Sequence, residues 1–259
     1  GDVYKRQILV IGYGLIGEKL AERYKDHNIL GIRRSDKQNH PNTVIVKADY
    51  RDEIPKEAVD FSPDWIIVSP KVENQEIDSY EHGFMNQLEL IKEKFKNTNK
   101  IFISSTRVLS GIINEQVDES AKPKPSDPQG EIIKRYEEDA LLDPTSYVLR
   151  LAGLITESSN FVNLVIEKKI FSTDKFINAI HIDDVINIID DVIQKKPTHR
   201  IINAVMPETI KYSDVNDGFK AEPVNPAIKS LHYNDVSFFK YPSIRELIWK
   251  AWQVSVKLV

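Results

Sequence analysis

Three glycines are spaced as G-x-G-x-x-G in the segment VIGYGLIGEKL, at positions 12, 14 and 17. The motif follows a short apolar run and precedes a pattern of helical period. In a strand–turn–helix unit, Gly12 permits the tight turn, Gly14 lets the backbone approach a pyrophosphate, and Gly17 lets the helix pack close to the strand. The free N–H groups at the helix start then face the phosphates. A chance glycine-rich turn is the alternative, but this context favours dinucleotide binding.

The residues after the second apolar run decide which dinucleotide fits. An NAD site usually places Asp or Glu about 20 residues beyond the glycines, bound to the ribose hydroxyls. Here Arg33 and Arg34 stand at that place. An arginine fork suits a 2′-phosphate, so we expect NADP, with NAD as the alternative because Asp36 lies nearby. Asp49 is expected either to accept from the adenine amine or to cap a loop. The residues expected to bind the cofactor are Gly12, Tyr13, Gly14, Leu15, Ile16, Gly17, Arg33, Arg34, Asp49, Ser69 and Lys71.

A lysine, a tyrosine and two glutamates follow one another in the helical segment GEIIKRYEEDALL, at 130–142. Positions 134 and 136 of an α-helix lie about 200° apart. If Lys134 faces a cofactor, Tyr136 therefore faces away and is expected to pack. Glu137 and Glu138 follow Lys134 by three and four residues, so each is expected to form a surface ion pair with it or, alternatively, to serve as a general base.

Strand-like and helix-like segments alternate through the first half of the chain. Apolar runs predict strands at 7–12, 28–34, 43–49, 64–70, 100–105 and 146–153, and helical spacing predicts helices at 15–26, 79–95 and 130–142. Such alternation predicts an α/β fold, a Rossmann-type doubly wound parallel sheet with helices on both faces. We expect residues 1–153 to form this domain and residues 154–259 to form mostly a small C-terminal substrate lobe, with 176–205 returning to the Rossmann domain.

The second half of the chain has a less regular pattern. Helices are expected at 161–169, 182–195 and 241–253, and short strands at 176–182 and 200–205. Ser243 precedes Glu246 by three residues, which predicts a capping box. His181 is expected to be structural at a strand end, or else to line the junction of the lobes, and Asp183 to cap the next helix.

Composition narrows the class of protein. The 259 residues carry a net charge of −4, which argues against a general nucleic-acid surface. No apolar run approaches the roughly 18 residues needed to span a bilayer, and no signal peptide is expected. The absence of cysteine excludes disulfides, thiol catalysis and cysteine-ligated zinc, and it fits a cytoplasmic protein. No spacing of His, Asp and Glu predicts a metal site.

Taken together, these residues give the chain a resemblance to a known superfamily. It resembles the short-chain dehydrogenase/reductases, in particular the extended branch of NAD-dependent epimerase/dehydratase proteins. The landmarks that match in order are GYGLIG (12–17), IFISSTRVLSG (101–111), DESAKPKPSD (118–127), YVLRLAGLI (147–155), NAIHIDDV (178–185) and KYPSIREL (240–247). The resemblance implies that the sheet binds the cofactor and that the C-terminal lobe covers the substrate.

The chain departs from that branch at three places. Ile11 replaces the first glycine of the usual G-x-x-G-x-x-G spacing, and VLS at 108–110 replaces the usual VYG. Tyr-x-x-x-Lys is absent, because the position four before Lys134 is Gly130. This pattern is similar to the atypical subgroup of the superfamily, which keeps the cofactor loop and the upstream serine but lacks the tyrosine.

The resemblance implies roles for the residues that remain. In such proteins the tyrosine exchanges a proton with the substrate oxygen, the lysine lowers the tyrosine pKa and holds the nicotinamide ribose, and the serine orients the substrate oxygen. Ser105, with its neighbours Ser104 and Thr106, is expected to supply the orienting hydroxyl, or else these residues simply end their strand. The catalytic candidates are Ser105, Thr106 and Lys134, and Gly130 can supply no proton.

Two functions follow from these observations. The first is an NADP-dependent oxidoreductase or epimerase that acts on a small polar or sugar-like substrate by non-standard catalysis. The second is a non-catalytic NADP-binding sensor or scaffold. The expected partner is a small molecule, and neither nucleic acid nor a membrane is expected.

Overall fold

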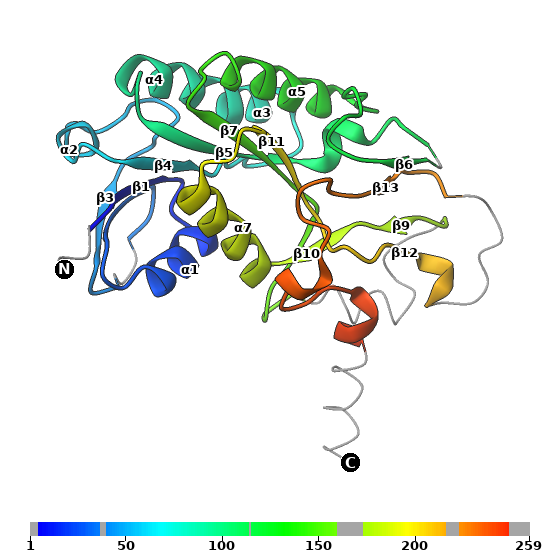
Figure 1. Ribbon diagram of the computed structural model, residues 1–259. Helices are drawn as coiled ribbons and strands as arrows, with labels where there is room; N and C mark the ends of the chain where they lie inside the picture. The colour runs from blue at the N-terminus through cyan, green and yellow to red at the C-terminus, as the bar shows by residue number, and fades with distance from the viewer. Residues whose placement is uncertain (1–4, 37–39, 114, 160–172, 216–222, 249–259) are drawn as a thin grey trace. The chain divides into compact units, whose positions relative to one another are not determined.

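Figure 1 shows the computed structural model, which describes residues 5–36, 40–113, 115–159, 173–215 and 223–248. The contacts divide the chain into two units. The first comprises Gly1–Ser104, Asp127–Leu149 and Val192–Ile201, and the second comprises Ser105–Ser126, Arg150–Asp191 and Ile202–Val259. The domain limits given above, at 153 and 154, stay a prediction.

A seven-stranded sheet has the strand order β11-β7-β5-β4-β1-β2-β3. Its strands are β1 (Gln7–Ile11), β2 (Asn28–Arg33), β3 (Thr43–Lys47), β4 (Trp65–Val68), β5 (Asn99–Ser105), β7 (Ser146–Leu151) and β11 (Ile201–Ala204). β1 is parallel to β2 and to β4, and the outer pairs β2–β3 and β4–β5 are parallel too. The chain winds outward from β1 in both directions, so the strand order reverses between β1 and β4. The predicted Rossmann-type α/β fold is confirmed.

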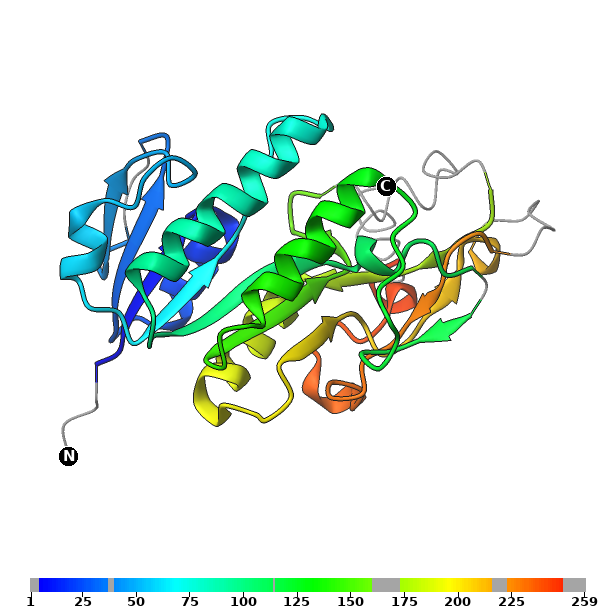
Figure 2. The same ribbon diagram turned by 90° about the horizontal axis from the view of Figure 1, so that it is seen from above.

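The central strands are apolar because both of their faces are covered. All four residues from Ile8 to Ile11 are fully buried. The residues of β4 are also fully buried, except Trp65, which is 2% exposed. Strands of parallel sheets are generally buried in this way. In the first unit, α1 (Leu15–Arg23) lies on the face of the sheet opposite α4 (Gln87–Lys94) and α5 (Pro128–Ala140), as Figures 1 and 2 show. A short α2 (Lys56–Asp60), which the sequence pattern did not predict, precedes β4.

The helix predicted at 79–95 has three parts. It begins as α3 (Ile77–Tyr80), continues as the π-helical segment η1 (Glu81–Asn86), and ends as α4. Gly83 in the π-helical part presses on the loop after β4, because a Cβ at Gly83 would lie 2.5 Å from the carbonyl oxygen of Lys71. The fully buried Gln87 donates from Nε2 to the Gly83 carbonyl, 2.7 Å away. A widened helical turn therefore holds the loop that carries Lys71.

The second unit is built from paired short strands. β8 (Gly153–Ile155) is parallel to β10 (Ala179–His181), β9 (Phe176–Ile177) is antiparallel to β12 (Ile210–Lys211), and β6 (Gln116–Val117) is parallel to β13 (Ala227–Ile228). The strand predicted at 176–182 is thus two strands with different partners. The unit also contains the 3-10 helices η2 (Thr106–Leu109), η3 (Tyr212–Asp214) and η4 (Val236–Phe238). Its core contains Ile155, Ile177, Ala179, Met206, Ile210, Tyr212 and Ile244.

The remaining predicted helices have different outcomes. α7 (Ile182–Lys195) has the predicted bounds, 182–195. Residues 244–248 are helical, and the Ser243 hydroxyl accepts from the Glu246 N–H at 3.2 Å, which is one half of the predicted capping box. The helix predicted at 161–169, like the end of the one at 241–253, lies outside the described residues. No described helix combines the length and the apolar character that crossing a membrane requires.

Candidate nucleotide-binding site

A cavity of about 300 Å³ lies where the strand order of the sheet reverses. Its walls come from the segments that follow β1, β2, β3 and β4, so it lies at the carboxyl ends of these parallel strands. Open α/β sheets bind their ligands at such a place. The lining residues are Gly12, Tyr13, Gly14, Arg33, Arg34, Ser35, Tyr50 and Lys71.

The first two glycines of the motif shape the cavity in different ways. Gly12 has φ +81°, and a Cβ there would lie 2.1 Å from the Ser69 carbonyl oxygen, so the turn requires glycine. Gly14 has φ −132° and precedes α1, whose first turn has no side-chain cap. A Cβ at Gly14 would meet nothing closer than the Lys71 Nζ at 3.7 Å. The space over Gly14 and the N–H groups of α1 that lack a side-chain cap form a cradle that could hold a phosphate.

Gly17 makes room for a tyrosine ring rather than for the strand itself. A Cβ at Gly17 would lie 2.5 Å from the ring of Tyr13, and one at Gly31 of β2 would lie 2.5 Å from the same ring. The ring of Tyr13 therefore fits between α1 and β2, and it is 3% exposed. The expected direct packing of helix on strand at Gly17 is corrected accordingly. Of the other expected loop contacts, Leu15 is partly exposed and Ile16 is buried.

The two arginines after β2 both line the cavity, but their partners differ. Arg33 donates from Nη2 to the Ser35 hydroxyl at 2.9 Å, and its buried Nε and Nη1 have no hydrogen-bond partner among the described residues. Arg34 donates from Nη1 to the Glu73 carboxylate at 2.5 Å. The two arginines therefore place positive charge at the cavity, which favours an anionic ligand.

Asp49 holds an arginine close to the cavity. Its Oδ1 accepts from the backbone N–H of Arg51 at 3.1 Å and from Nε at 2.8 Å, while Oδ2 accepts from Nη2 at 2.6 Å. These hydrogen bonds from Arg51 lower the pKa of Asp49 to about 2. The loop-capping alternative for Asp49 is therefore present in the structure. Contact between Asp49 and an adenine stays a prediction.

Ser69 and Lys71 follow β4, which lies beside β1 at the point where the strand order reverses. The N–H of Ser69 donates to the Ile11 carbonyl at 2.8 Å, and the residue is buried below Gly12. Lys71 is exposed and lines the cavity beside Gly14. Lys71 therefore places a positive charge next to the cradle at Gly14. The backbone carbonyl of Ser69 instead packs against Gly12 in the turn.

The expected catalytic residues lie at the end of β5 and on α5. Ser105 accepts from the N–H of Arg107 at 3.2 Å and so caps η2, and the half-buried Thr106 begins that helix. Lys134 forms an ion pair with Glu131 at 3.5 Å. The expected surface location of Glu137 is corrected, because Glu137 is 2% exposed and accepts from the Ser104 hydroxyl at 2.5 Å. Glu137 lies next to Tyr136, on the side of α5 that packs into the protein.

Tyr136 packs in the core, as expected. It is fully buried, and its ring makes edge-to-face contacts with Phe84 and Phe102 at centroid distances of 5.1 and 5.7 Å. Burial raises the pKa of Tyr136 well above its ordinary value. A phenol in this environment keeps its proton, and that Tyr136 has no catalytic role stays a prediction.

In the second unit, His181 has a structural environment. It is 4% exposed, its ring centroid lies 4.0 Å from that of Tyr241, and its Nδ1 accepts from the N–H of Asp183 at 3.2 Å. Burial lowers the pKa of His181. Asp183 lies inside the first turn of α7, which begins at Ile182, and its carboxylate pairs with Lys240 at 2.6 Å. The expected helix cap at Asp183 is therefore corrected to an ion pair.

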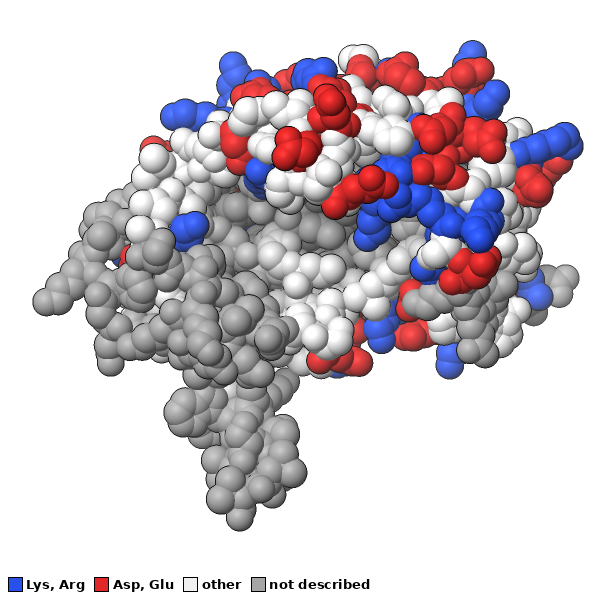
Figure 3. Space-filling view, turned by 180° about the vertical axis from the view of Figure 1, so that it is seen from behind, with Lys and Arg blue, Asp and Glu red and all other residues white. Residues whose placement is uncertain are grey.

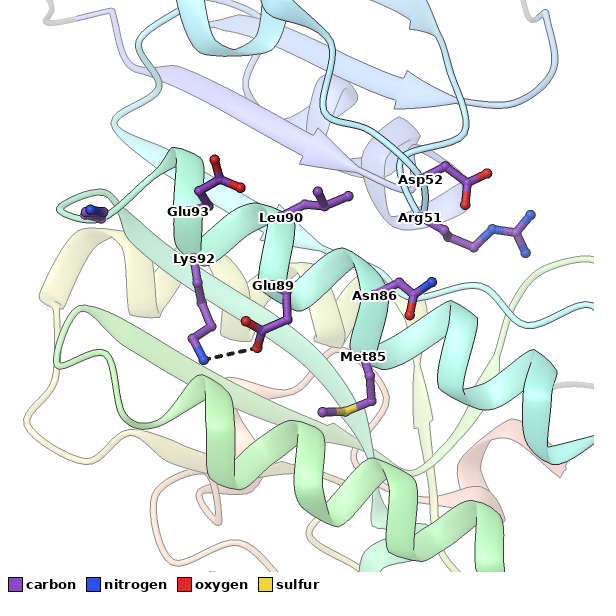
Figure 4. Close-up of a pocket in the computed structure, with 9 residues that line it drawn as sticks. Arg51, Asp52, Met85, Asn86, Glu89, Leu90, Lys92 and Glu93 are labelled. Carbon is purple, nitrogen blue, oxygen red and sulfur yellow. Dashed lines mark hydrogen bonds and ion pairs between the residues drawn. The ribbon is translucent and has the colours of Figure 1, made fainter.

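A second, larger hollow of about 830 Å³ lies beside α4, where side chains of opposite charge alternate with Met85 and Leu90 (Figure 4). Lys92 and Glu89 form an ion pair there at 3.3 Å. Among the described residues, no three His, Asp or Glu side chains gather as a metal site requires. Basic and acidic side chains are interspersed on the face drawn in Figure 3.

Comparison with known proteins identifies the fold. No family model and no curated protein matches the chain. The solved structure of a candidate NAD-dependent epimerase/dehydratase from Methylobacillus flagellatus matches with a TM-score of 0.73 and 20% identity, over 98% of this chain and 100% of that one. dTDP-glucose 4,6-dehydratase from Bacillus anthracis, in complex with NAD, matches with 0.74 and 15%, over 96% and 97%. L-threonine dehydrogenase from Clostridium difficile matches with 0.71 and 16%, over 96% and 97%.

Sequence reasoning missed three residues around the cavity. Tyr50 lines it, is 2% exposed, and has a hydroxyl without a hydrogen-bond partner among the described residues. Ser35 lines it through its contact with Arg33, and Glu73 binds Arg34 from the loop after β4. Ser35 directly follows the two arginines in the sequence, and this position could have marked it as a residue near the cavity. Glu73 and Tyr50 had no such signal, because tertiary structure alone brings them there.

Proposed function

We propose that this chain binds a nicotinamide dinucleotide in the cavity at Gly12 and Gly14, with NADP preferred over NAD. The cradle over Gly14 is the observation that carries this proposal, because it combines open space with an uncapped helix start and the exposed Lys71. Arg33 and Arg34 line the same cavity, where they would bind the 2′-phosphate by charge-assisted hydrogen bonds. The solved dTDP-glucose 4,6-dehydratase with this fold contains NAD, which supports the assignment of the ligand class.

We further propose that the protein is an oxidoreductase or epimerase acting on a small polar or sugar-like substrate. The bound nicotinamide would supply a hydride acceptor or donor. The chain itself would hold the phosphates at Gly14 and orient a substrate oxygen with Ser105 or Thr106. Lys134 would hold the cofactor from α5. The matched structures are of an epimerase/dehydratase, a dehydratase and a dehydrogenase, which supports this class.

The second candidate is an NADP-binding sensor or scaffold without turnover. The observation that favours it is the burial of Tyr136, whose phenol packs between Phe84 and Phe102. With glycine at 130, the helix offers no phenol as proton donor. The two candidates share the cofactor site and differ in whether hydride transfer follows binding.

Thermal unfolding tests the choice of cofactor. NADP should raise the melting temperature more than NAD at equal concentration, because a ligand that binds the folded state stabilises it. Arg33→Ala with Arg34→Ala should remove the difference, since each charge-assisted hydrogen bond contributes about 1.5–3 kcal/mol. Arg135→Ala is the control, because Arg135 pairs with Glu81 on the surface of α5. If NAD and NADP raise the melting temperature of the parent protein equally, the preference for NADP is contradicted.

Turnover separates the enzyme from the sensor. The oxidised cofactor is mixed with the protein and with a panel of sugar nucleotides and small polyols, and the absorbance of reduced nicotinamide is followed. A signal that depends on substrate and is lost with Gly14→Val supports the enzyme. Binding of cofactor without any such signal across the panel, and without epimerised product, favours the sensor.

A further inference from the structure

Glu73 connects two arginines at the edge of the cavity. Its Oε1 accepts from Arg34 Nη1 at 2.5 Å and from Arg51 Nη2 at 3.1 Å. Arg51 is 5% exposed and is also held by both carboxylate oxygens of Asp49. Arg34 has no such second carboxylate among the ion pairs of the described residues, so its contact with Glu73 is its main restraint.

The position of Glu73 is fixed by the loop that carries it. Its backbone N–H donates to the Ser79 hydroxyl at 2.8 Å, and the N–H of Asn74 donates to the same hydroxyl at 3.3 Å. The start of the loop is held by Gly83, which packs against the carbonyl of Lys71. The loop therefore presents Lys71 to the phosphate cradle and Glu73 to Arg34 as a fixed unit.

The charge of Glu73 opposes the charge that the proposed ligand would bring. Hydrogen bonds from Arg34 and then from Arg51 lower the pKa of Glu73, so it is ionised at neutral pH. A 2′-phosphate bound by Arg34 would compete with this carboxylate for the same guanidinium. It would also lie near a charge of its own sign, and like charges repel.

We propose that Glu73 is a specificity-determining residue that weakens the preference for a 2′-phosphate by holding Arg34. This inference rests on the proposed nucleotide site. In the proposed arrangement Arg34 must share its guanidinium between the phosphate and Glu73, whereas the hydrogen bond of Arg33 goes to the uncharged hydroxyl of Ser35. The carboxylate of Glu73 would thereby reduce the difference between the affinities for NADP and for NAD, although the two arginines favour NADP.

The probes are adenosine 2′,5′-bisphosphate and adenosine 5′-monophosphate, which differ only in the 2′-phosphate. Calorimetric titration of Glu73→Gln should show about three- to tenfold tighter binding of the bisphosphate, because the competing charge is removed. Binding of the monophosphate should not change. The gain should shrink in high salt, since the Glu73 side chain is 56% exposed and exposed charges are screened.

Two further variants make the test specific. Glu76→Gln removes the same charge from the same loop, at a residue with no ion pair among the described side chains, and it should leave both affinities unchanged. In a protein that already carries Arg34→Ala, Glu73→Gln should change the ratio of the two affinities less than it does in the parent, because only the direct repulsion between Glu73 and the phosphate remains. An equal change in both backgrounds would show that Glu73 does not act through Arg34.

The outcomes separate this inference from the nucleotide site itself. If the parent binds the bisphosphate but Glu73→Gln leaves its affinity unchanged or weakens it, the role of Glu73 is wrong and the site stands. If Glu76→Gln has the same effect as Glu73→Gln, the effect is one of net charge and the inference is also overturned. If the parent binds neither probe nor either dinucleotide, the nucleotide site is wrong and this inference falls with it.

Discussion

The hydroxyl of Ser104, at the end of β5, donates to the carboxylate of Glu137 on α5 at a distance of 2.5 Å. Both residues are nearly inaccessible, with exposed fractions of 5% and 2%. Burying a carboxyl group is costly unless it accepts hydrogen bonds, and the Ser104 hydroxyl supplies one of them. Because Ser104 belongs to β5 and Glu137 to α5, this hydrogen bond also links the sheet to the helix. It also explains why a glutamate occupies the inner face of a helix that otherwise buries apolar residues and Tyr136.

We expect Ser104→Ala to lower the free energy of unfolding by about 1–3 kcal/mol, the range for leaving a buried polar group without its hydrogen-bond partner. Chemical denaturation measures the change. Glu138→Gln, an exposed carboxylate change on the same helix, is the control and should stay within about 0.5 kcal/mol of the parent. Ser104→Ala and Glu137→Gln should not be additive, because they remove the same contact. A loss at Ser104 no larger than that at Glu138 would contradict this account.

The two glycines of the cavity should respond to substitution in opposite ways. Gly14→Val should fold normally and lose nucleotide binding, because its side chain would occupy the cradle beside Lys71 and a Cβ at Gly14 lies 3.9 Å from the Gly12 carbonyl oxygen. Gly12→Ala should destabilise the fold itself, because its Cβ would lie 2.1 Å from the Ser69 carbonyl and its φ is +81°. Melting temperature and nucleotide titration measure the two effects.

Two results would contradict this pair of predictions. If Gly14→Val binds nucleotide as tightly as the parent, the loop is only a turn and the alternative reading of the motif holds. If Gly12→Ala melts at the parent temperature, the carbonyl of Ser69 moves freely and the turn does not require glycine.

The sequence predicted the sheet because each strand is a short apolar run closed by polar residues or glycine. It failed where structure depends on contacts between distant residues. The π-helical segment inside the predicted helix at 79–95 arises where Gly83 meets the loop at Lys71, and no periodicity encodes that contact. Helical spacing predicts Glu137 near Lys134, but spacing alone does not say how deeply a helix face is buried. The packing of α5 on the sheet buries Glu137 and brings its carboxylate to Ser104.

The cavity shows the same division between local and long-range information. The motif and the pair of arginines were visible as local patterns, and the first two glycines of the motif line one cavity with both arginines. Tyr50 and Glu73 were not predicted, because their roles come from the packing of segments that follow different strands. For Asp49 the sequence left a loop cap and an adenine contact as alternatives, and it did not predict Arg51 as the partner of this carboxylate.

The Asp49–Arg51 pair should contribute to stability in a defined range of pH. The folded-state pKa of Asp49 is about 2, below the ordinary value of 3.8, so its contribution is complete above about pH 4 and is lost as the pH falls toward 2. Asp49→Asn should lower the free energy of unfolding at pH 7 by about 1–2 kcal/mol and by less at pH 3. Urea unfolding of both proteins at the two pH values measures this. A deficit that is equal at both pH values would show that ionisation of Asp49 does not contribute.

The phenol of Tyr136 has no hydrogen-bond partner among the described residues, and its ring is fully buried. Tyr136→Phe should therefore keep or raise the free energy of unfolding, by up to about 1 kcal/mol, because a buried hydroxyl without a partner is unfavourable. Tyr136→Ala should lose about 3–5 kcal/mol, since it removes the ring that contacts Phe84 and Phe102. Nucleotide affinity should be the same in Tyr136→Phe as in the parent. If Tyr136→Phe instead abolishes turnover while folding normally, Tyr136 is the displaced acid and its role in the core is secondary.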